Sequence, residues 1–293
     1  MTTLPPFTVH RATTVEEASD LLDRLGDDAV VYCGGTELLL VYKFGFADYG
    51  ALVDIKPIEE LHGIVAEPTE LRIGAAVTHR EIERSPVVEE HVPALAQMER
   101  LVANVRVRNQ GTIGGNLCFA DPHSDPATFL IAAGGAVTVR RGGQPARRIP
   151  IEEFVLGPFE TALEPGELLV SVHVPRPPAN SAFVHRKMSF VERPAITVAA
   201  QVQVADGAIS HARLAVGSVG VAPVRVQAAE ELLVGMSAAS PDAKTIAAVG
   251  DAAVDAAKPI GDANGSVDYK AQLVRVLSGR VLREAAAEAL AAA

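Results

Sequence analysis

Two diglycine segments constrain this chain more than any other feature of its sequence. The first spans residues 30–39 around Gly34-Gly35, and the second spans residues 108–117 around Gly114-Gly115. Glycine has no Cβ, so backbone N–H groups in such a segment can closely approach a bound group. Successive N–H groups that point inward form a nest for an anion, and a helix starting just after them adds its dipole. Two such segments, roughly eighty residues apart, predict a clamp on both sides of a diphosphate.

Composition excludes several classes of protein. The chain is 48% apolar but only 4% aromatic, so its core must consist mainly of Ala, Val, Leu and Ile. A net charge of −10 argues against a nucleic-acid surface. Cys33 and Cys118, the only cysteines, cannot supply a four-thiolate cluster or a disulfide framework. The early prolines are not a signal sequence, and no apolar run approaches the roughly 20 residues of a membrane span. We therefore expect a soluble, cytoplasmic protein.

The beginning of the chain predicts a small α/β unit. Residues 14–17 form a capping box, and the helix that follows should end at Gly26. Residues 29–33 are typical of a buried strand that leads into the first diglycine segment. A short helix over 37–42 and a short apolar strand over 51–55 complete the unit.

A second unit follows Pro57. Residues 71–77 alternate as a half-buried strand, and residues 78–81 form a second capping box. A helix from about Pro93 to Ala103 should lead into the second diglycine segment, and strands are expected at 136–140 and 168–174.

Three prolines within residues 175–178 mark a boundary, after which an α+β domain is expected. Strands at 196–204 and 212–219 flank Asp206-Gly207, a β-hairpin signal. Helices are predicted at 226–234, at 245–257 and from about 266 to the end, the last with Leu273, Leu277 and Val281 on one face. Its basic residues are interpreted as a solvated face, with a subunit contact as the alternative; they are Lys270, Arg275, Arg280 and Arg283.

The glycine spacing excludes the better-known nucleotide sites. A Rossmann fingerprint needs Gly-x-Gly-x-x-Gly after a strand, and a P-loop needs Gly-Lys-Ser/Thr. Neither pattern occurs at the two segments.

Ordered motifs along nearly the whole chain instead resemble the FAD-binding medium subunit of molybdenum hydroxylases. That family includes the medium subunit of aerobic carbon monoxide dehydrogenase and the flavin domain of xanthine dehydrogenase. The most specific match is Val107-Arg108-Asn109-Gln110-Gly111-Thr112-Ile113-Gly114-Gly115-Asn116-Leu117. The others are Gly34–Leu39, Val53–Ile55, Ile73–His79, Ala120–Ala127, Pro165–Leu169 and Asp268–Leu277.

The resemblance implies an α+β fold. Residues 1–176 would form a two-subdomain FAD-binding domain of the vanillyl-alcohol-oxidase (PCMH) type, with subdomains at about 1–57 and 58–176. Residues 177–293 would form a C-terminal α+β domain of the carbon monoxide dehydrogenase flavoprotein type.

The resemblance also implies a non-covalent FAD site. Residues that would wrap the pyrophosphate through backbone amides are Val30, Val31, Tyr32, Cys33, Gly34, Gly35, Thr36 and Glu37. Residues that would close from the other side are Gly111, Thr112, Ile113, Gly114, Gly115 and Asn116. Asp125 would contact FAD, Leu169 and Lys187 would lie near the isoalloxazine ring, and Thr78 and Val102 belong to the same site. A cation such as Lys187 would stabilise negative charge on the reduced ring.

Some residues have simpler interpretations. Cys33 and Cys118 are typical of small buried residues. His79 is interpreted as a helix-terminal or adenine-side contact rather than as a catalyst. His123 could attach FAD covalently, but the branch resembled here does not do so. Phe119 and Asp121 stand where the family usually has small or neutral residues, and Pro194, within residues 191–196, lies near a position that is often acidic.

The resemblance implies an electron relay rather than substrate conversion. A molybdopterin-binding large subunit would oxidise the substrate, and a small subunit with [2Fe–2S] centres would pass electrons to FAD in this chain. The assembly would be a dimer of heterotrimers, a heterohexamer. Substrate and external acceptor are open, because substrate specificity belongs to the large subunit. The alternatives are a self-sufficient FAD-dependent oxidase or dehydrogenase and a non-catalytic FAD-binding assembly module.

Overall fold

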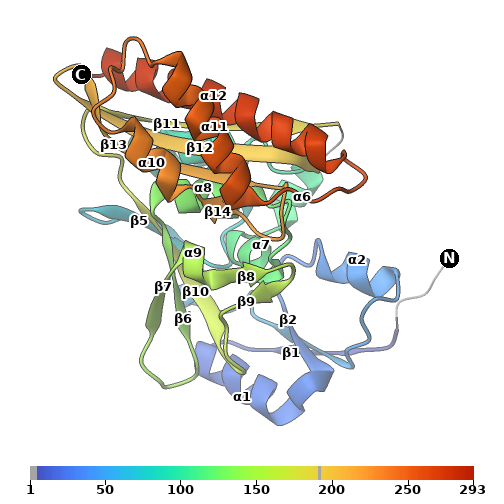
Figure 1. Ribbon diagram of the computed structural model, residues 1–293. Helices are drawn as coiled ribbons and strands as arrows, with labels where there is room; N and C mark the ends of the chain where they lie inside the picture. Colours follow the sequence, from blue (N-terminus) through green and yellow to red (C-terminus); the bar gives the residue numbers. More distant parts are fainter. Residues whose placement is uncertain (1–4, 191–192) are drawn as a thin grey trace.

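The computed structural model describes residues 5–190 and 193–293. Three larger sheets succeed one another along the molecule, each with its own helices, and a fourth, two-stranded sheet lies beside the middle one (Figure 1). The predicted α+β class is confirmed. No helix in the described part of the chain is long and apolar enough to cross a membrane.

The N-terminal unit is a parallel sheet of order β1-β3-β2 with helix α1 beside it (Figure 1). Its elements are β1 (Thr8–Arg11), α1 (Val15–Leu25), η1 (Gly26–Asp28), β2 (Ala29–Tyr32), α2 (Leu38–Lys43) and β3 (Ala51–Asp54). The predicted capping box is wrong in one detail, because the Glu17 carboxylate accepts from Thr13 N at 2.7 Å rather than from Thr14 N. The predicted burial of the 29–33 strand is also wrong, since all of β2 is partly exposed.

The central unit is an antiparallel sheet of order β4-β5-β10-β6-β7. Its strands are β4 (Ile64–Ala66), β5 (Glu70–Gly74), β6 (Ala136–Arg140), β7 (Arg147–Pro150) and β10 (Leu168–Pro175). A short hairpin of β8 (Val155–Gly157) and β9 (Glu160–Thr161) lies beside this sheet. The short helix η2 (Glu59–Leu61) precedes β4 in the chain. The sheet shares a core with the N-terminal unit, because Leu168 and Val170 of β10 pack with Val15 and Ala18 of α1.

Several short helices cover the central sheet. They are α3 (His79–Arg84), α4 (Pro86–His91), α5 (Pro93–Glu99), α6 (Val105–Gln110), α7 (Ile113–Phe119), α8 (Asp125–Ala133) and α9 (Ile151–Phe154). The capping box at Thr78 is confirmed. The helix predicted to reach Ala103 ends at Glu99, and Ala103 itself has φ 40°.

The C-terminal domain is an antiparallel sheet of order β11-β12-β13-β14 between two layers of helices. Its strands are β11 (Ser181–Ser189), β12 (Pro194–Ala205), β13 (Ala208–Gly217) and β14 (Val224–Arg225). Helices α10 (Gln227–Leu233), α11 (Ala243–Ala257) and α12 (Val267–Ala291) cover the outer face, and α8 packs on the other (Figure 1). Strand β11 begins after the prolines of 175–178, and the domain boundary at 176 stays a prediction.

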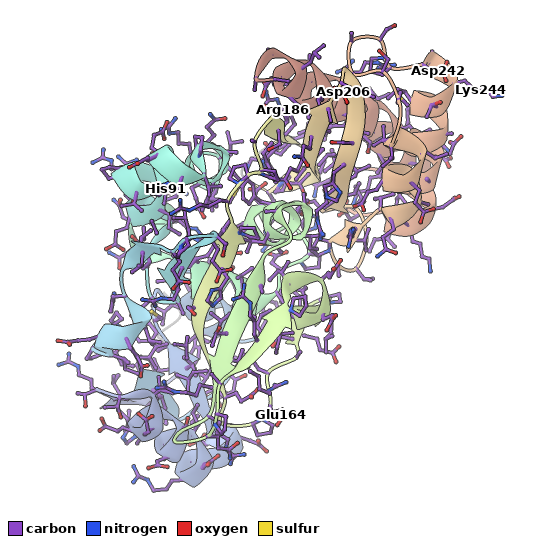
Figure 2. The ribbon with its side chains drawn as sticks, turned by 90° about the vertical axis from the view of Figure 1, so that its left-hand side faces the viewer. His91, Glu164, Arg186, Asp206, Asp242 and Lys244 are labelled. Atoms are coloured by element: carbon purple, nitrogen blue, oxygen red, sulfur yellow. The ribbon has the colours of Figure 1, made fainter. Side chains whose placement is uncertain are left out.

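The predicted hairpin is present at the tip of β12 and β13. Asp206 and Gly207 have φ of 51° and 76°, as a type I′ turn requires. Figure 2 shows Asp206 at the end of the C-terminal domain remote from Glu164, together with Asp242, which caps α11.

Lys270 is not part of a solvated helix face, contrary to the sequence-based interpretation. The residue is fully buried, and its Nζ lies 2.7 Å from Asp262 Oδ2 in the turn before α12. A lysine can be buried in this way because a carboxylate accompanies it. The other three basic residues are exposed.

Candidate functional site

The first diglycine segment follows β2, and some of its backbone amides have no hydrogen-bond acceptor within the described chain. Leu39 N donates to Gly35 O at 3.1 Å, and no described backbone acceptor pairs with the amides of Gly35, Thr36 or Glu37. Gly35 has φ 71°, a conformation that favours glycine. Three successive free N–H groups are the arrangement that binds an anion.

The second diglycine segment is helical, which corrects the expectation that a loop precedes a helix there. Thr112 caps α7, and its Oγ1 accepts from Gly115 N at 3.0 Å. A Cβ added at Gly114 would lie 2.6 Å from Ala75 Cβ, so this glycine lets α7 pack closely on the chain after β5. A Cβ on Gly34 would lie 2.3 Å from Gln110 O, which shows that the two segments touch.

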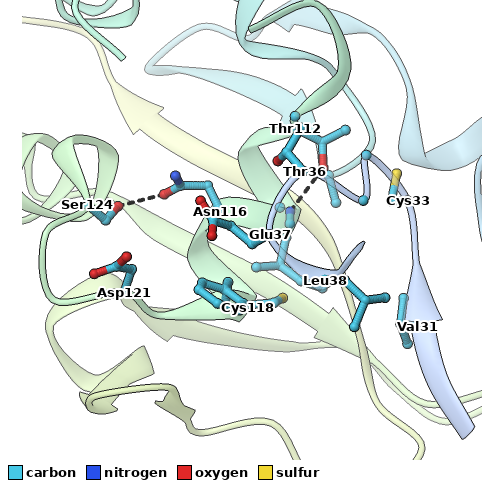
Figure 3. Close-up of a pocket in the computed structure, with 18 of the residues that line it drawn as sticks. Val31, Cys33, Thr36, Glu37, Leu38, Thr112, Asn116, Cys118, Asp121 and Ser124 are labelled. Atoms are coloured by element: carbon cyan, nitrogen blue, oxygen red, sulfur yellow. Dashed lines mark hydrogen bonds between the residues drawn. The ribbon is translucent and has the colours of Figure 1, made fainter. Parts of the chain in front are cut away.

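Both segments border one cavity of about 590 Å³ (Figure 3). Fifteen of the predicted site residues line it: Val30, Val31, Cys33, Gly34, Gly35, Thr36, Glu37, Val102, Gly111, Thr112, Gly114, Gly115, Asn116, Asp125 and Leu169. Asn116 is held in place by Ser124, whose Oγ donates to its Oδ1 at 2.6 Å (Figure 3). Two segments that are remote in sequence therefore meet at one cavity, as the hypothesis of a clamp around a diphosphate requires.

Four predicted site residues do not line the cavity, and their role in the site stays a prediction: Tyr32, Thr78, Ile113 and Lys187. The Tyr32 ring instead contacts Lys56, whose Nζ lies 3.8 Å from the ring centre. The Thr78 side chain caps α3, and Ile113 is buried in the core of the central unit. Lys187 borders an adjacent groove rather than the cavity.

Lys187 is joined to the cavity through Asp125. Lys187 Nζ lies 2.8 Å from Asp125 Oδ2 and also donates to Leu101 O. Asp125 Oδ1 is buried without a hydrogen-bond partner, 3.8 Å from His185 Nε2. Burial raises the pKa of Asp125 to about 6, against the opposing effect of Lys187. Burial likewise lowers the pKa of His185 to about 3, so His185 is neutral.

The cavity wall also includes residues outside the predicted set of site residues. Those that the sequence analysis discussed individually are His79, Cys118, Phe119, Asp121, His123 and Pro194. The cavity is consistent with the adenine-side interpretation of His79. Others include Leu22, Leu38, Leu40, Ile55, Ala75, Val107, Ser124, Leu163, Glu167, Leu168 and Arg193. The apolar residues among them carry no local signal for the site, because only the packing of the two units brings them together.

Of the three residues that depart from the family pattern, Phe119 and Asp121 have partners at the cavity wall. Phe119 packs edge-on against Phe159 with ring centres 5.2 Å apart, and Arg193 Nη2 lies 2.8 Å from Asp121 Oδ2. Pro194 opens β12, whereas Val191 and Glu192 of the same departure lie outside the described residues. Neither cysteine is fully buried, since both border the cavity. Burial nevertheless raises the pKa of the Cys118 thiol to about 12.

These features define a flavin-dinucleotide-binding protein. Free amides at Gly35–Glu37 suit a diphosphate, and the apolar wall that includes Val102, Leu168 and Leu169 suits a flavin ring. The cavity lies between two α/β units, where cofactor sites commonly occur.

Comparison with known proteins identifies the family. Residues 5–177 match the FAD binding domain in molybdopterin dehydrogenase, and residues 191–285 match the CO dehydrogenase flavoprotein C-terminal domain. The chain therefore belongs to the FAD-binding subunit family of the molybdenum hydroxylases, and it is an oxidoreductase subunit with FAD as its cofactor.

Relatives match over nearly the full length. The carbon monoxide dehydrogenase medium chain of Hydrogenophaga pseudoflava is 32% identical, over 96% of this chain and 97% of that one. The 6-hydroxypseudooxynicotine dehydrogenase complex subunit alpha of Paenarthrobacter nicotinovorans is 34% identical, over 96% and 95%. A solved carbon monoxide dehydrogenase from Hydrogenophaga pseudoflava, which lacks the Mo-pyranopterin moiety of its cofactor, superposes with a TM-score of 0.93 at 32% identity, covering 98% of this chain and 99% of that one.

Proposed function

We propose that this chain is the FAD-carrying electron-transfer subunit of a molybdenum hydroxylase complex. It takes electrons from [2Fe–2S] centres on a small partner subunit and passes them to an external acceptor, while a large partner subunit holds the molybdenum–pterin cofactor. One cavity walled by both diglycine segments carries the proposal, together with relatives named as a medium chain and as a complex subunit. FAD is held non-covalently, and the complex is a cytoplasmic dimer of heterotrimers.

The residues of the cavity divide the cofactor between them. The amides of Gly35–Glu37 hold the diphosphate, and α7 closes on it from Thr112 to Asn116. Leu169 borders the flavin ring, and Asp125 offers its carboxyl group with Lys187 behind it. A bound flavin supplies the ability to accept electrons singly and release them in pairs, which suits a junction between iron–sulfur centres and an acceptor.

A self-sufficient flavin oxidase is the alternative function, and the geometry disfavours it. Such an enzyme needs a free base that can reach an organic substrate over the flavin. Most of the acid and base groups at this cavity are instead engaged: Asp125 with Lys187, Asp121 with Arg193, and His79 Nδ1 with Glu99. Glu37 is the wall carboxylate without a hydrogen bond or ion pair among the described residues, so it would have to serve as that base. Electron relay needs no such base. A non-catalytic assembly module is distinguished by whether its bound flavin can be reduced.

The test is the colour and redox behaviour of the purified chain. We expect bound FAD that dithionite reduces and that no member of a panel of carbon monoxide, purines, aldehydes and N-heterocycles reduces without the partner subunits. Reduction by a panel member in the isolated chain would support the oxidase instead. A colourless chain after co-expression with both partners would contradict any FAD role. Metal analysis of the native complex, assayed with the same panel and with quinone, cytochrome, dioxygen and NAD, would then identify substrate and acceptor.

A further inference from the structure

A buried histidine–glutamate pair borders the cavity, and the proposed relay assigns it no role. His79 is the first residue of α3 and only 2% exposed, and Glu99 at the end of α5 is fully buried. Their Nδ1 and Oε2 atoms lie 2.7 Å apart, and Glu99 Oε1 has no other partner. His79 Nδ1 is thus engaged with Glu99, and none of the described residues pairs with His79 Nε2.

The imidazole lies where the two diglycine segments meet. His79 N donates to Gly111 O at 3.1 Å. A Cβ on Gly111 would lie 3.3 Å from His79 Cδ2 and 3.2 Å from Thr36 Oγ1. Since Cδ2 is bonded to Nε2, the ring edge that carries the second nitrogen lies beside Gly111, which also adjoins Thr36 of the first segment. The amides of Gly35–Glu37 in that segment have no described acceptor.

A diphosphate in this cavity must be held against the carboxylates that border it, which are Glu37, Asp121, Asp125 and Glu167. The cationic side chains nearby are already engaged. Arg193 pairs with Asp121 and is 57% exposed, and Lys187 pairs with Asp125. His123 lies with its Nδ1 2.9 Å from Pro194 O. Among the described residues at the cavity wall, His79 is the buried basic group with a ring nitrogen left for a ligand.

Building on the proposed FAD function, we propose that His79, oriented by Glu99, binds the FAD diphosphate through its Nε2–H. Nε2–H donates to a phosphate oxygen on one side, and the amides of Gly35–Glu37 donate on the other. A charge-assisted hydrogen bond of this kind is about twice as strong as a neutral one.

The test compares three probes by calorimetry and fluorescence: FAD, ADP and riboflavin, the last of which has no phosphate. We expect His79→Gln to weaken FAD and ADP binding about 10- to 100-fold, while riboflavin binding is unchanged and thereby reports an intact fold. His211→Gln, at an exposed histidine of β13, is the matched control.

Two outcomes would overturn the proposal. One is an equal loss of riboflavin and ADP affinity in His79→Gln, which would indicate a packing role. The other is an unchanged affinity of His79→Gln for both FAD and ADP while the unmodified chain binds FAD normally. Failure of the unmodified chain to bind FAD at all would overturn the proposed function as well, so the two failures are distinguishable.

Discussion

Buried His185 and Asp125 should oppose each other in the acid stability of the FAD-free chain. The pKa of His185 is lowered to about 3 by burial, from an ordinary value of 6.5. Between these values the unfolded chain binds one more proton than the folded chain at this site, so stability falls as pH falls. The pKa of Asp125 is raised by burial to about 6, from 3.8. Between these values the folded chain binds the extra proton, so stability rises as pH falls.

The magnitudes follow from the overlap of the two windows. One pH unit of a one-proton difference is worth about 1.4 kcal/mol, so each group contributes about 2–3 kcal/mol between pH 6 and 4, with opposite signs. As pH falls from 6 to 4, the unfolding free energy of Asp125→Asn should therefore decrease by about 2–3 kcal/mol relative to that of the parent chain. Over the same fall in pH, the unfolding free energy of His185→Gln should increase by a similar amount relative to the parent chain.

Urea unfolding at several pH values between 4 and 6 measures these slopes. His211→Gln is the control, because that histidine is exposed on β13. Slopes are compared rather than absolute stabilities, since Asp125→Asn also leaves Lys187 without its carboxylate. Parallel curves for Asp125→Asn, His185→Gln and the parent chain would refute the reasoning.

Three further changes test other parts of the structure. Gly34→Ala places a Cβ 2.3 Å from Gln110 O and should reduce FAD affinity at least about tenfold. In the control Gly143→Ala, the added Cβ meets no atom within 4 Å, and FAD should bind normally. Equal FAD affinities of the two variants would contradict the close contact between Gly34 and Gln110. Asp262→Ala should lower the unfolding free energy by about 3–5 kcal/mol in urea unfolding, because it leaves Lys270 buried without a counter-charge. Lys270→Met should lower it by less, because the Asp262 side chain that remains is 29% exposed. The reverse order of the two losses would show that Lys270 is not buried. Iodoacetamide should modify the Cys118 thiol slowly, since its pKa is about 12, and more slowly still with FAD bound; mass spectrometry that shows no protection would argue against its place in the cavity wall.

Local chemistry predicted the elements that carry their own signals. The capping box at Thr78 and the Asp206-Gly207 turn are each specified within four residues, and both are present. Strand β11 and helices α7 and α8 were not anticipated. Helix α7 holds two glycines, and α8 is buried along its whole length, so neither shows the amphipathic period of a surface helix.

The site was predictable where backbone amides form it and not where packing forms it. Diglycine segments are visible in a sequence because they lack side chains. Lys270 and the His79–Glu99 pair were misjudged or missed, because burial of a charged residue depends on a partner elsewhere in the chain. Glu99 is twenty residues from His79, and no local pattern joins them.

Transfer of electrons from the iron–sulfur partner to the FAD of this chain is the most direct test of the proposed relay. The small subunit with [2Fe–2S] centres would be reduced, freed of excess reductant, and mixed anaerobically with the FAD-loaded chain while flavin absorbance is followed. The relay predicts bleaching of the flavin as the iron–sulfur centres are reoxidised, in proportion to the electrons supplied. A flavin that stays oxidised beside reduced iron–sulfur centres, yet is bleached by dithionite, would contradict it.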